Sequence, residues 1–278
     1  MKILTTGGNG QLGWELQRYS EVTGYTREML DITQPASIEK IFTLFQPDIV
    51  INAAAYTAVD KAETETDLAF KINRDGAENL AKACNRIDVP LVHISTDYIF
   101  DGKKSTPYTE DHMPYPLGVY GKSKWDGEER VRMHCPKHII LRVSGVFSQH
   151  GHNFVKTILR IAREREGFRI VADQIICPTP AADIATAILD MVKQPLKYGT
   201  YHYCSNEPTT WYDFTKAIVA YAGLKKEIQP ITTADYPLPA QRPHYSVLDT
   251  HKMYAQYGIQ TKSWRSGLSE VIKNVQAA

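Results

Sequence analysis

The chain has 278 residues, of which 43% are hydrophobic and 23% are charged, and its formal net charge is +1. These proportions are ordinary for a soluble globular protein, and the length allows one large domain or two small ones around a sizeable core. A nearly neutral chain has no electrostatic reason to bind nucleic acid or an anionic membrane. We therefore expect neither partner, although local Lys and Arg side chains remain able to hold a phosphorylated small molecule.

The four cysteines are Cys84, Cys135, Cys177 and Cys204, and they form no CxxC motif and no zinc-like cluster. Scattered cysteines in a chain of this size are typical of reduced thiols in the cytosol. The apolar run within the N-terminal MKILTTGGNGQLG is too short for a signal peptide. No stretch approaches the roughly 18 apolar residues of a membrane span. The sequence therefore predicts a cytoplasmic protein without a membrane segment.

The first half of the chain alternates short apolar runs with longer amphipathic stretches. Strands separated by helices of this length indicate βαβ units, and hence a parallel sheet that is covered on both faces. The expected strands are residues 2–6, 23–26, 48–52, 90–96 and 138–144. The expected helices are residues 11–19, 36–46, 64–86 and 119–134.

The pattern changes after about residue 145, where elements become shorter and prolines more frequent. Helices are expected at 153–167, 181–194, 210–223 and near 268–276, and strands at 168–173 and 199–205. The CPTP stretch at 177–180 predicts a turn. The proline-rich segment 230–249 predicts an ordered surface loop, and long loops of this kind are usually functional or mobile.

Three glycines follow the first strand directly: Gly7, Gly10 and Gly13 in KILTTGGNGQLGWEL. Glycine permits unusual φ angles and close approach of the backbone to a ligand, and a helix N-terminus offers N–H donors to a pyrophosphate. A glycine triplet at the end of a buried strand in a βαβ chain therefore predicts a dinucleotide site, whereas a tight turn without ligand is the plainer alternative.

Two further places support a dinucleotide. Arg27 follows the second expected strand, where an arginine can pair with the 2′-phosphate of NADP and an acidic residue would favour NAD. NADPH is therefore the expected cofactor, with NADH possible and a solvated arginine as the alternative reading. Asp31 and Ile32 are placed to bracket an adenine ring, and the small residues of NAAAYT (52–57) leave room for a flat ligand at a strand's carboxyl end.

These observations predict an α/β protein with a Rossmann-like, doubly wound parallel sheet and a smaller, interwoven C-terminal substrate-binding domain. We expect residues 1–145, with return segments near 181–205, to form the NAD(P)-binding domain. The discontinuous remainder, mainly 146–278, is expected to bind substrate.

Tyr-x-x-x-Lys occurs three times, at Tyr120/Lys124, Tyr212/Lys216 and Tyr221/Lys225. Residues four apart are neighbours on a helix, but this spacing also arises by chance. Only the first pair follows a strand that ends in hydroxyl and carboxyl side chains, Ser95, Thr96 and Asp97. The other two pairs lie far beyond the nucleotide-binding half and are interpreted as ordinary helix-face residues.

The first pair in this context predicts proton transfer to a carbonyl group. Tyrosine has a reference pKa of about 10, and we expect a lysine ammonium and a nicotinamide cation to stabilise the phenolate. Lowering the pKa of the phenol by about three units requires roughly 4 kcal/mol. Thr96 would then hold the carbonyl oxygen, Tyr120 would give it a proton as hydride arrives at carbon, and Lys124 would bind the nicotinamide ribose.

Together these residues resemble the extended short-chain dehydrogenase/reductase superfamily and, within it, the dTDP-4-dehydrorhamnose reductase family. The resemblance runs from residue 2 to about 270. It is carried by VINAAAYTAVDKAE (50–63), STDYIFDG (95–102), VYGKSK (119–124), NFVKTILRIARE (153–164), DQIICPTPAADIA (173–185) and AQRPHYSVLD (240–249). Several of these stretches lie outside the shared cofactor core.

The resemblance implies reduction of the 4-keto group of dTDP-6-deoxy-L-lyxo-4-hexulose with NAD(P)H, which gives dTDP-L-rhamnose for bacterial cell-surface polysaccharide. It implies Thr96, Tyr120 and Lys124 as the catalytic set. We expect the cofactor to contact Gly7, Gly10, Gln11, Leu12, Gly13, Arg27, Asp31, Ile32, Ala53, Ala54, Ala55, Tyr56, Thr57, Ser95, Tyr120 and Lys124. We expect the sugar nucleotide to contact Thr96, Asp97, Tyr98, Gly145, Asn153, Gln174, Thr179 and Arg242. Arg242 is suited to a diphosphate because a guanidinium binds phosphate in two-pronged fashion.

Two positions depart from the family pattern. Gly145 stands in RVSGVF, where relatives often carry a tryptophan, so an aromatic wall of the sugar site is missing. Some relatives bind Mg²⁺ through glutamates at a dimer interface. Glu15 matches one such position, but the sequence does not reveal the other ligands, so metal dependence and the choice between monomer and homodimer stay open.

Four other functions compete with a reductase. A 4,6-dehydratase would need a glutamate after Asp97, where Tyr98 stands. A sugar 4-epimerase would have to hold its cofactor permanently and rotate the keto sugar. A reductase that forms 6-deoxytalose differs only in the face of the ketone that takes hydride. The intact set of Thr96, Tyr120 and Lys124 argues against a non-catalytic regulatory relative.

Overall fold

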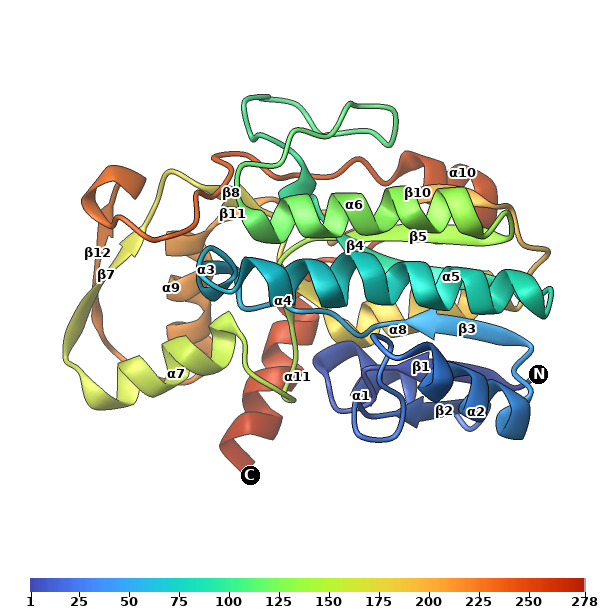
Figure 1. The fold of residues 1–278 in the computed structure, drawn as a ribbon. Helices are drawn as coiled ribbons and strands as arrows, with labels where there is room; N and C mark the ends of the chain where they lie inside the picture. The colour runs from blue at the N-terminus through green and yellow to red at the C-terminus, as the bar shows by residue number, and fades with distance from the viewer. Residues whose placement is uncertain (278) are drawn as a thin grey trace.

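The computed structural model describes residues 1–277, and a parallel sheet lies at its centre (Figure 1). Its strands are β1 (Ile3–Thr6), β2 (Val22–Tyr25), β3 (Ile49–Asn52), β4 (Leu91–Thr96), β5 (His138–Val143) and β10 (Gly199–Tyr203). They lie in the order β10-β5-β4-β3-β1-β2, and every neighbouring pair is parallel. The predicted α/β fold class with a Rossmann-like parallel sheet is therefore confirmed.

The strand order reverses beside β1. The strand that follows β1 in the chain, β2, lies on one side of it, and β3 lies on the other. In open parallel sheets, ligands bind outside the carboxyl ends of the strands at such a reversal. The crevice between the ends of β1 and β3 is thus the place where this topology favours a ligand.

Helices cover both faces of the sheet. One face carries α1 (Gln11–Leu16), α8 (Ala181–Val192) and α10 (His251–Tyr257), and the other carries α2 (Pro35–Phe45), α5 (Gly76–Arg86) and α6 (Val119–His134). Successive strand residues point to opposite faces, so Ile3 packs in the first layer and Leu4 in the second. This two-sided burial explains why the strands are continuous apolar runs.

A second, smaller core lies beside the sheet. It is built from α7 (Phe154–Glu164), α9 (Trp211–Tyr221) and α11 (Trp264–Ala277), and Phe147, Phe214 and Trp264 are buried in it. A two-stranded parallel ribbon, β7 (Gly167–Val171) with β12 (Glu227–Ile231), packs at its outer edge. Figure 1 shows this group at the end of the molecule opposite the N-terminus.

Several elements differ from the prediction. The helix expected at 64–86 is α4 (Thr66–Phe70), a π-helical turn at Lys71–Asp75 and α5. The helices α3 (Val59–Ala62) and α10 and the strand β12 were not predicted. The expected turn at 177–180 includes the strand β9 (Thr179–Pro180), which pairs with β6 (Val146–Phe147). Across residues 1–277, no helix has the length and apolar character that a membrane crossing needs.

Candidate active site

The glycine loop lies in the crevice at the strand-order reversal. Gly7 has a φ of +67°, and a Cβ on it would approach within 2.8 Å of the Ala54 backbone nitrogen. A Cβ on Gly13 would overlap the carbonyl oxygen of Gly7. The turn is closed by a 2.8 Å hydrogen bond from the Gly10 N–H to Gly7 O. The loop and the alanine segment thus form a cradle that larger residues would fill, which fits a dinucleotide pyrophosphate.

The carboxyl ends of β1, β3 and β4 are tied together by polar side chains. Thr6 Oγ1 donates to Asn52 Oδ1 at 2.8 Å and accepts from the Ala54 N–H at 3.2 Å. Asn52 Nδ2 and His93 Nδ1 are 3.0 Å apart. These contacts fix the start of the alanine segment, residues 53–55, against the glycine loop.

The residues expected at the adenosine end have mixed surroundings. The Arg27 side chain is 65% exposed, and its Nε lies 3.9 Å from Asp31 Oδ2. Asp31 Oδ1 accepts from the Thr33 N–H at 2.9 Å, so this carboxylate shapes its own turn. Ile32 is buried against Gly76 of α5. Arg27 is therefore free to reach a ligand, whereas Ile32 mainly packs in the core.

The structure brings Thr96, Tyr120 and Lys124 together. Thr96 ends β4 and is buried, while Tyr120 and Lys124 lie one turn apart on α6, which packs against β4. The hydroxyl of Thr96 is close enough to Tyr120 to lower the pKa of its phenol. The ring of Tyr98 meets the ring of Tyr120 edge-on, with centroids 5.9 Å apart.

The expected acidification of Tyr120 by Lys124 does not arise from the chain itself. Burial raises the pKa of Tyr120 to about 12, and the nearby Asp97 carboxyl adds to this rise. Lys124 Nζ instead donates to the carbonyl oxygen of Ile94 at 2.6 Å. Burial also lowers the pKa of Lys124 to about 8, against the opposing charge of Glu128. Within the protein, the phenol is therefore a protonated donor at neutral pH.

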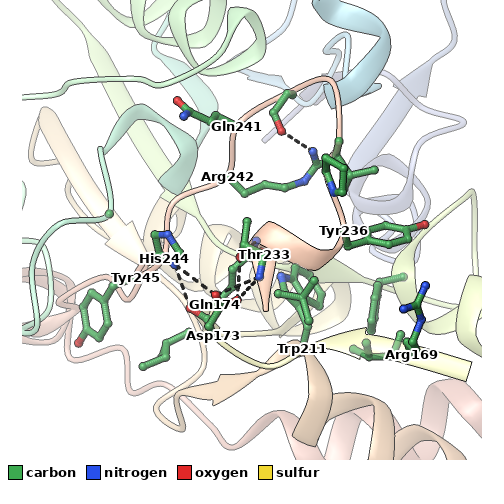
Figure 2. Close-up of a pocket in the computed structure, with 18 of the residues that line it drawn as sticks. Arg169, Asp173, Gln174, Trp211, Thr233, Tyr236, Gln241, Arg242, His244 and Tyr245 are labelled. Atoms are coloured by element: carbon green, nitrogen blue, oxygen red, sulfur yellow. Dashed lines mark hydrogen bonds and ion pairs between the residues drawn. The ribbon is translucent and has the colours of Figure 1, made fainter. Parts of the chain in front are cut away.

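A cavity of about 1750 Å³ opens between the end of the sheet and the smaller core. Of the residues expected at the sugar nucleotide, Tyr98, Gln174 and Arg242 line it. Figure 2 shows aromatic and cationic side chains around it that were not predicted. Those labelled there are Arg169, Trp211, Tyr236, His244 and Tyr245.

The remaining expected substrate residues lie outside the lining of this cavity. Gly145 has a φ of +56°, which glycine adopts easily, and a Cβ there would approach Pro178. Thr179 is buried and donates to Cys177 O at 3.0 Å. Asp97 is 3% exposed, and its carboxyl group faces the hydroxyls of Thr96 and Ser144.

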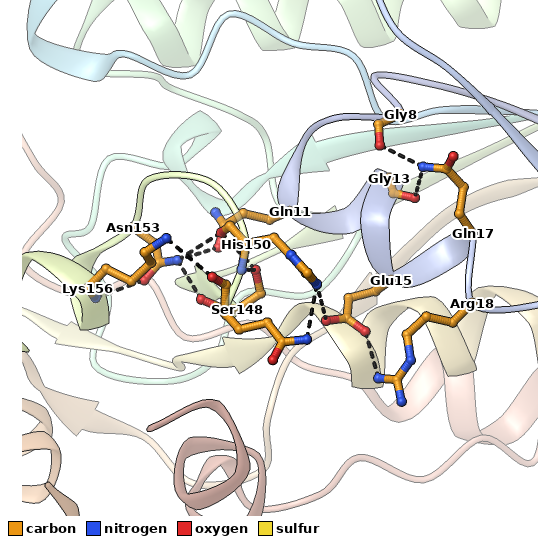
Figure 3. A network of polar contacts seen from close by, with 11 residues as sticks. Gly8, Gln11, Gly13, Glu15, Gln17, Arg18, Ser148, His150, Asn153 and Lys156 are labelled. Atoms are coloured by element: carbon orange, nitrogen blue, oxygen red, sulfur yellow. Dashed lines mark hydrogen bonds and ion pairs between the residues drawn. The ribbon is translucent and has the colours of Figure 1, made fainter. Parts of the chain in front are cut away.

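Asn153 connects the glycine loop to the smaller core (Figure 3). Its Oδ1 accepts from the Lys156 N–H at 3.2 Å, so it caps the N-terminus of α7. Its Nδ2 donates to Gln11 Oε1 at 3.0 Å. Asn153, expected at the substrate, and Gln11, expected at the pyrophosphate, therefore contact each other.

Glu15 is held by protein groups. Its carboxylate lies 3.0 Å from Arg18 and 4.0 Å from His150 (Figure 3). The His150 ring also stacks on Trp14, with ring centroids 4.7 Å apart. Within residues 1–277, no group of three or more His, Cys, Asp or Glu side chains is arranged to hold a metal ion.

The other two Tyr-x-x-x-Lys pairs lie away from this site. Tyr212 is on α9, where the Lys216 ammonium lies 5.1 Å from its ring centroid. Tyr221 is 45% exposed at the end of the same helix. Lys124 is buried, whereas Lys216 and Lys225 are exposed, so position in the fold and burial of the lysine separate the first pair from the two chance matches.

Three polar residues at the site were missed in the sequence. Asp60 of α3 forms a bidentate pair with Arg242, with both N–O distances at 2.7 Å. Glu63 accepts from the Val119 N–H at 2.8 Å, at the start of α6. Asn73 in the π-helical turn accepts from the Tyr56 N–H at 2.8 Å and donates to Ser123 of α6 at 2.9 Å. No local pattern marks these residues, because their partners lie 17 to 182 positions away.

Comparison with known proteins gives concordant matches over the whole chain. The family model described as RmlD substrate binding domain matches residues 1–277. A dTDP-4-dehydrorhamnose reductase from Aggregatibacter actinomycetemcomitans is 42% identical, with 99% of this chain and 98% of the relative covered.

Two solved structures are similar in fold and sequence. A dTDP-4-dehydrorhamnose reductase from Clostridium acetobutylicum gives a TM-score of 0.95 at 40% identity, covering 99% of this chain and 100% of the other. The reductase of that name from Bacillus anthracis, in complex with NADP, gives 0.94 at 38% identity, covering 98% and 99%.

Proposed function

Because the chain belongs to the dTDP-4-dehydrorhamnose reductase family, we propose that it reduces the 4-keto group of dTDP-6-deoxy-L-lyxo-4-hexulose to give dTDP-L-rhamnose. It is an NAD(P)H-dependent oxidoreductase of dTDP-rhamnose and polysaccharide biosynthesis. One observation supports the residue assignment: Thr96 and Tyr120 lie close together at the carboxyl edge of the sheet, which also carries the glycine cradle, with Lys124 one helical turn away. Tyr98, two residues after Thr96, lines the large cavity.

The chain's own groups have distinct roles in this proposal. When bound, NAD(P)H supplies the hydride. Tyr120, protonated because burial raises its pKa to about 12, gives its proton to the ketone oxygen as that oxygen gains alkoxide character. Thr96 donates a hydrogen bond to the same oxygen and fixes its position. Lys124, anchored on Ile94 O, adds positive charge that stabilises the phenolate that remains.

Binding is divided between the two parts of the chain. We assign the NAD(P)-binding domain to residues 1–145 with return segments near 181–205, and sugar-nucleotide binding mainly to 146–278. The glycine loop, Gln11 and the alanine segment 53–55 hold the cofactor. Tyr98, Gln174 and Arg242 contact the sugar nucleotide, since they line the cavity. Asn153 and Thr179 do not line the cavity, and they support its wall from behind.

The proposal also covers the cofactor preference, the metal requirement and the cellular location of the enzyme. NADPH is the preferred cofactor, because Arg27 is exposed and able to meet a 2′-phosphate; KM values for NADPH and NADH decide this. A metal requirement is not included, since Glu15 pairs with Arg18. We place the enzyme in the cytoplasm.

The reaction is tested with the purified enzyme, NADPH and the keto sugar nucleotide. Tyr120→Phe is expected to fold and bind cofactor but to lose about 10²- to 10⁴-fold in kcat, because the proton donor is gone. Tyr212→Phe is the matched control and is expected to keep a near-normal rate. Comparable rates in the two variants contradict the assignment. Product identification by NMR separates dTDP-L-rhamnose from a 6-deoxytalose product, and absence of cofactor oxidation would indicate a non-catalytic relative.

A further inference from the structure

Asp97 bears a buried carboxyl group that has no cationic partner in the part of the chain that the structure describes. It follows Thr96 at the end of β4, and its side chain is 3% exposed. Its two oxygens meet hydroxyl groups: Oδ1 lies 3.1 Å from Thr96 Oγ1, and Oδ2 lies 2.8 Å from Ser144 Oγ. Within residues 1–277, no Lys, Arg or His forms an ion pair with it.

The groups whose pKa responds to the charge of Asp97 are themselves neutral at pH 7. They are Tyr98 beside it, Tyr120 on α6 and Cys177 shortly before β9, and ionisation of Asp97 would help to raise the pKa of each. A carboxylate in such a place would be an isolated buried charge, which normally takes up a proton. Burial accordingly raises the pKa of Asp97.

Hydroxyl groups only partly offset this burial. Those of Ser246, Ser144 and Thr96 lower the pKa of Asp97, in that order. Ser246 Oγ is fully buried and makes no hydrogen bond of ordinary geometry within residues 1–277. Ser246 therefore offers, beside the carboxyl group, a hydroxyl that can donate or accept a hydrogen bond.

The hydroxyl group of Thr96 faces the Asp97 carboxyl group, the Tyr98 N–H and the phenol of Tyr120. A hydroxyl has one hydrogen to donate and two lone pairs. One lone pair accepts from the Tyr98 N–H at 3.2 Å. If Asp97 were ionised, it could only accept, and the single hydrogen of Thr96 would be directed to Asp97 Oδ1. Thr96 would then have no hydrogen for a ketone oxygen.

We propose that Asp97 is a neutral carboxylic acid whose O–H donates to Thr96 Oγ1, which turns the Thr96 hydrogen toward the ketone oxygen of the substrate. Asp97 Oδ2 meanwhile accepts from Ser144. Asp97 is thus a positioning residue that acts through Thr96 and does not itself touch the sugar. This inference rests on the proposed function, because it gives Thr96 a ketone oxygen to hold.

The protonation state is tested without turnover. The infrared difference spectrum of wild type minus Asp97→Asn, recorded at neutral pH on free enzyme, is expected to contain the carbonyl stretch of a protonated carboxyl group. If the difference spectrum instead contains the bands of an ionised carboxylate, the proposal is overturned. Circular dichroism and NADPH binding show that the variant is folded.

The orienting role is tested by kinetics. Asn is isosteric and can donate to Thr96 while it accepts from Ser144, so Asp97→Asn is expected to lower kcat by no more than about threefold. Asp97→Leu is expected to lower kcat about 100-fold with little change in the KM of the sugar, as when an oriented donor is lost. Equal losses in the two variants, or a loss confined to KM, would show that Asp97 works as a carboxylate or binds the sugar.

A double-mutant cycle links Asp97 to Thr96. In a Thr96→Val background, Asp97→Leu is expected to lower kcat less than about threefold further, since both changes remove the same hydrogen bond. Full additivity would overturn the proposal. If Thr96→Val alone keeps normal turnover, the proposed role of Thr96 fails, whereas the infrared result still reports on Asp97.

Discussion

Lys124 is a buried ammonium group with a single hydrogen-bond partner among residues 1–277. Its side chain is almost fully enclosed, and Nζ donates to Ile94 O at 2.6 Å. Burial disfavours its charged form more than Glu128 favours it, and the pKa of Lys124 falls to about 8. The charge that the mechanism needs is thus lost as the pH rises through about 8.

We therefore predict that kcat/KM falls above about pH 8 in the wild type, since this parameter reports groups of the free enzyme. Tyr120, with a pKa near 12, titrates too high to cause that fall. Lys124→Arg should remove it, because a guanidinium stays protonated. The pH profile of each enzyme is measured, with Lys122→Arg on the same helix as control. If kcat/KM of Lys124→Arg still falls above about pH 8, another group causes that fall.

The proposed catalytic residues were selected from the sequence, but their pKa values could not be predicted from it. Spacing and context selected Tyr120 and Lys124, because one turn of helix and the end of a strand are local features. The direction of the Lys124 side chain depends on Ile94, 30 positions earlier. The burial that raises the pKa of Tyr120 depends on the packing of several elements.

At the scale of elements, α6 joins the site to the core of the sheet. Its bounds, 119–134, agree with the prediction. Glu128, one turn beyond Lys124, is fully buried and accepts from Arg142 of β5 at 2.9 and 2.8 Å and from Arg132 at 2.7 Å. This ion cluster anchors the helix that carries Tyr120 and Lys124.

We predict that Glu128→Gln lowers the free energy of unfolding by about 3–5 kcal/mol, because it leaves the buried Arg142 without its counter-charge. The neighbouring Glu129→Gln is the control. Glu129 is half exposed and pairs only with Arg132 in the described chain, so a cost of about 0–1 kcal/mol is expected. Denaturant unfolding measures both. Equal losses of unfolding free energy in the two variants would show that the buried cluster stabilises the fold no more than a surface ion pair does.

The same cluster predicts an acid dependence. Arg142 and Arg132 hold the pKa of Glu128 at about 2, below its ordinary value. A depressed carboxyl pKa stabilises the fold above the unfolded pKa of about 4.3 and loses that contribution as the pH falls toward 2. The stability difference between wild type and Glu128→Gln should therefore narrow over this interval.

Most elements were predictable because their signals are local. Apolar runs gave β1, β3, β4 and β5, the short segments 23–26 and 199–205 gave β2 and β10, and apolar periodicity gave helices such as α2. The short helix α3 has too few residues for periodicity, and the π-helical turn Lys71–Asp75 leaves no sequence mark that differs from an α-helix. β12 lies beside a proline-rich segment, and its strand conformation depends on its pairing with β7.

At the scale of the whole molecule, a few long-range contacts join the two parts around the site. Asn153 of the smaller core bonds Gln11 in the glycine loop. Arg242 in the 230–249 segment pairs with Asp60 of α3, which also accepts from the Ala240 N–H at 3.2 Å. The sequence indicated that segment 230–249 is a functional loop and that Arg242 binds phosphate. It did not indicate that Asp60 holds both the loop and the arginine.

Asp60 keeps Arg242 and its loop in place before substrate arrives. The pair is bidentate, and it lowers the pKa of Asp60, so the carboxylate is charged at neutral pH. An ordered arginine loses less freedom when it binds a ligand than a mobile one does. Asp60→Ala is therefore expected to raise the KM for the dTDP-sugar about fivefold, with kcat nearly unchanged.

The loop itself provides a second readout that needs no turnover. Hydrogen exchange of the Ala240 amide should accelerate in Asp60→Ala, because its acceptor is gone, whereas amides of β4 should keep their protection. Asp67→Ala removes an exposed carboxylate from the neighbouring helix α4 and serves as control for both measurements. If Asp60 instead competes with the diphosphate for Arg242, the KM falls while exchange still accelerates. A fall in KM would therefore contradict the ordering role even though the contact exists.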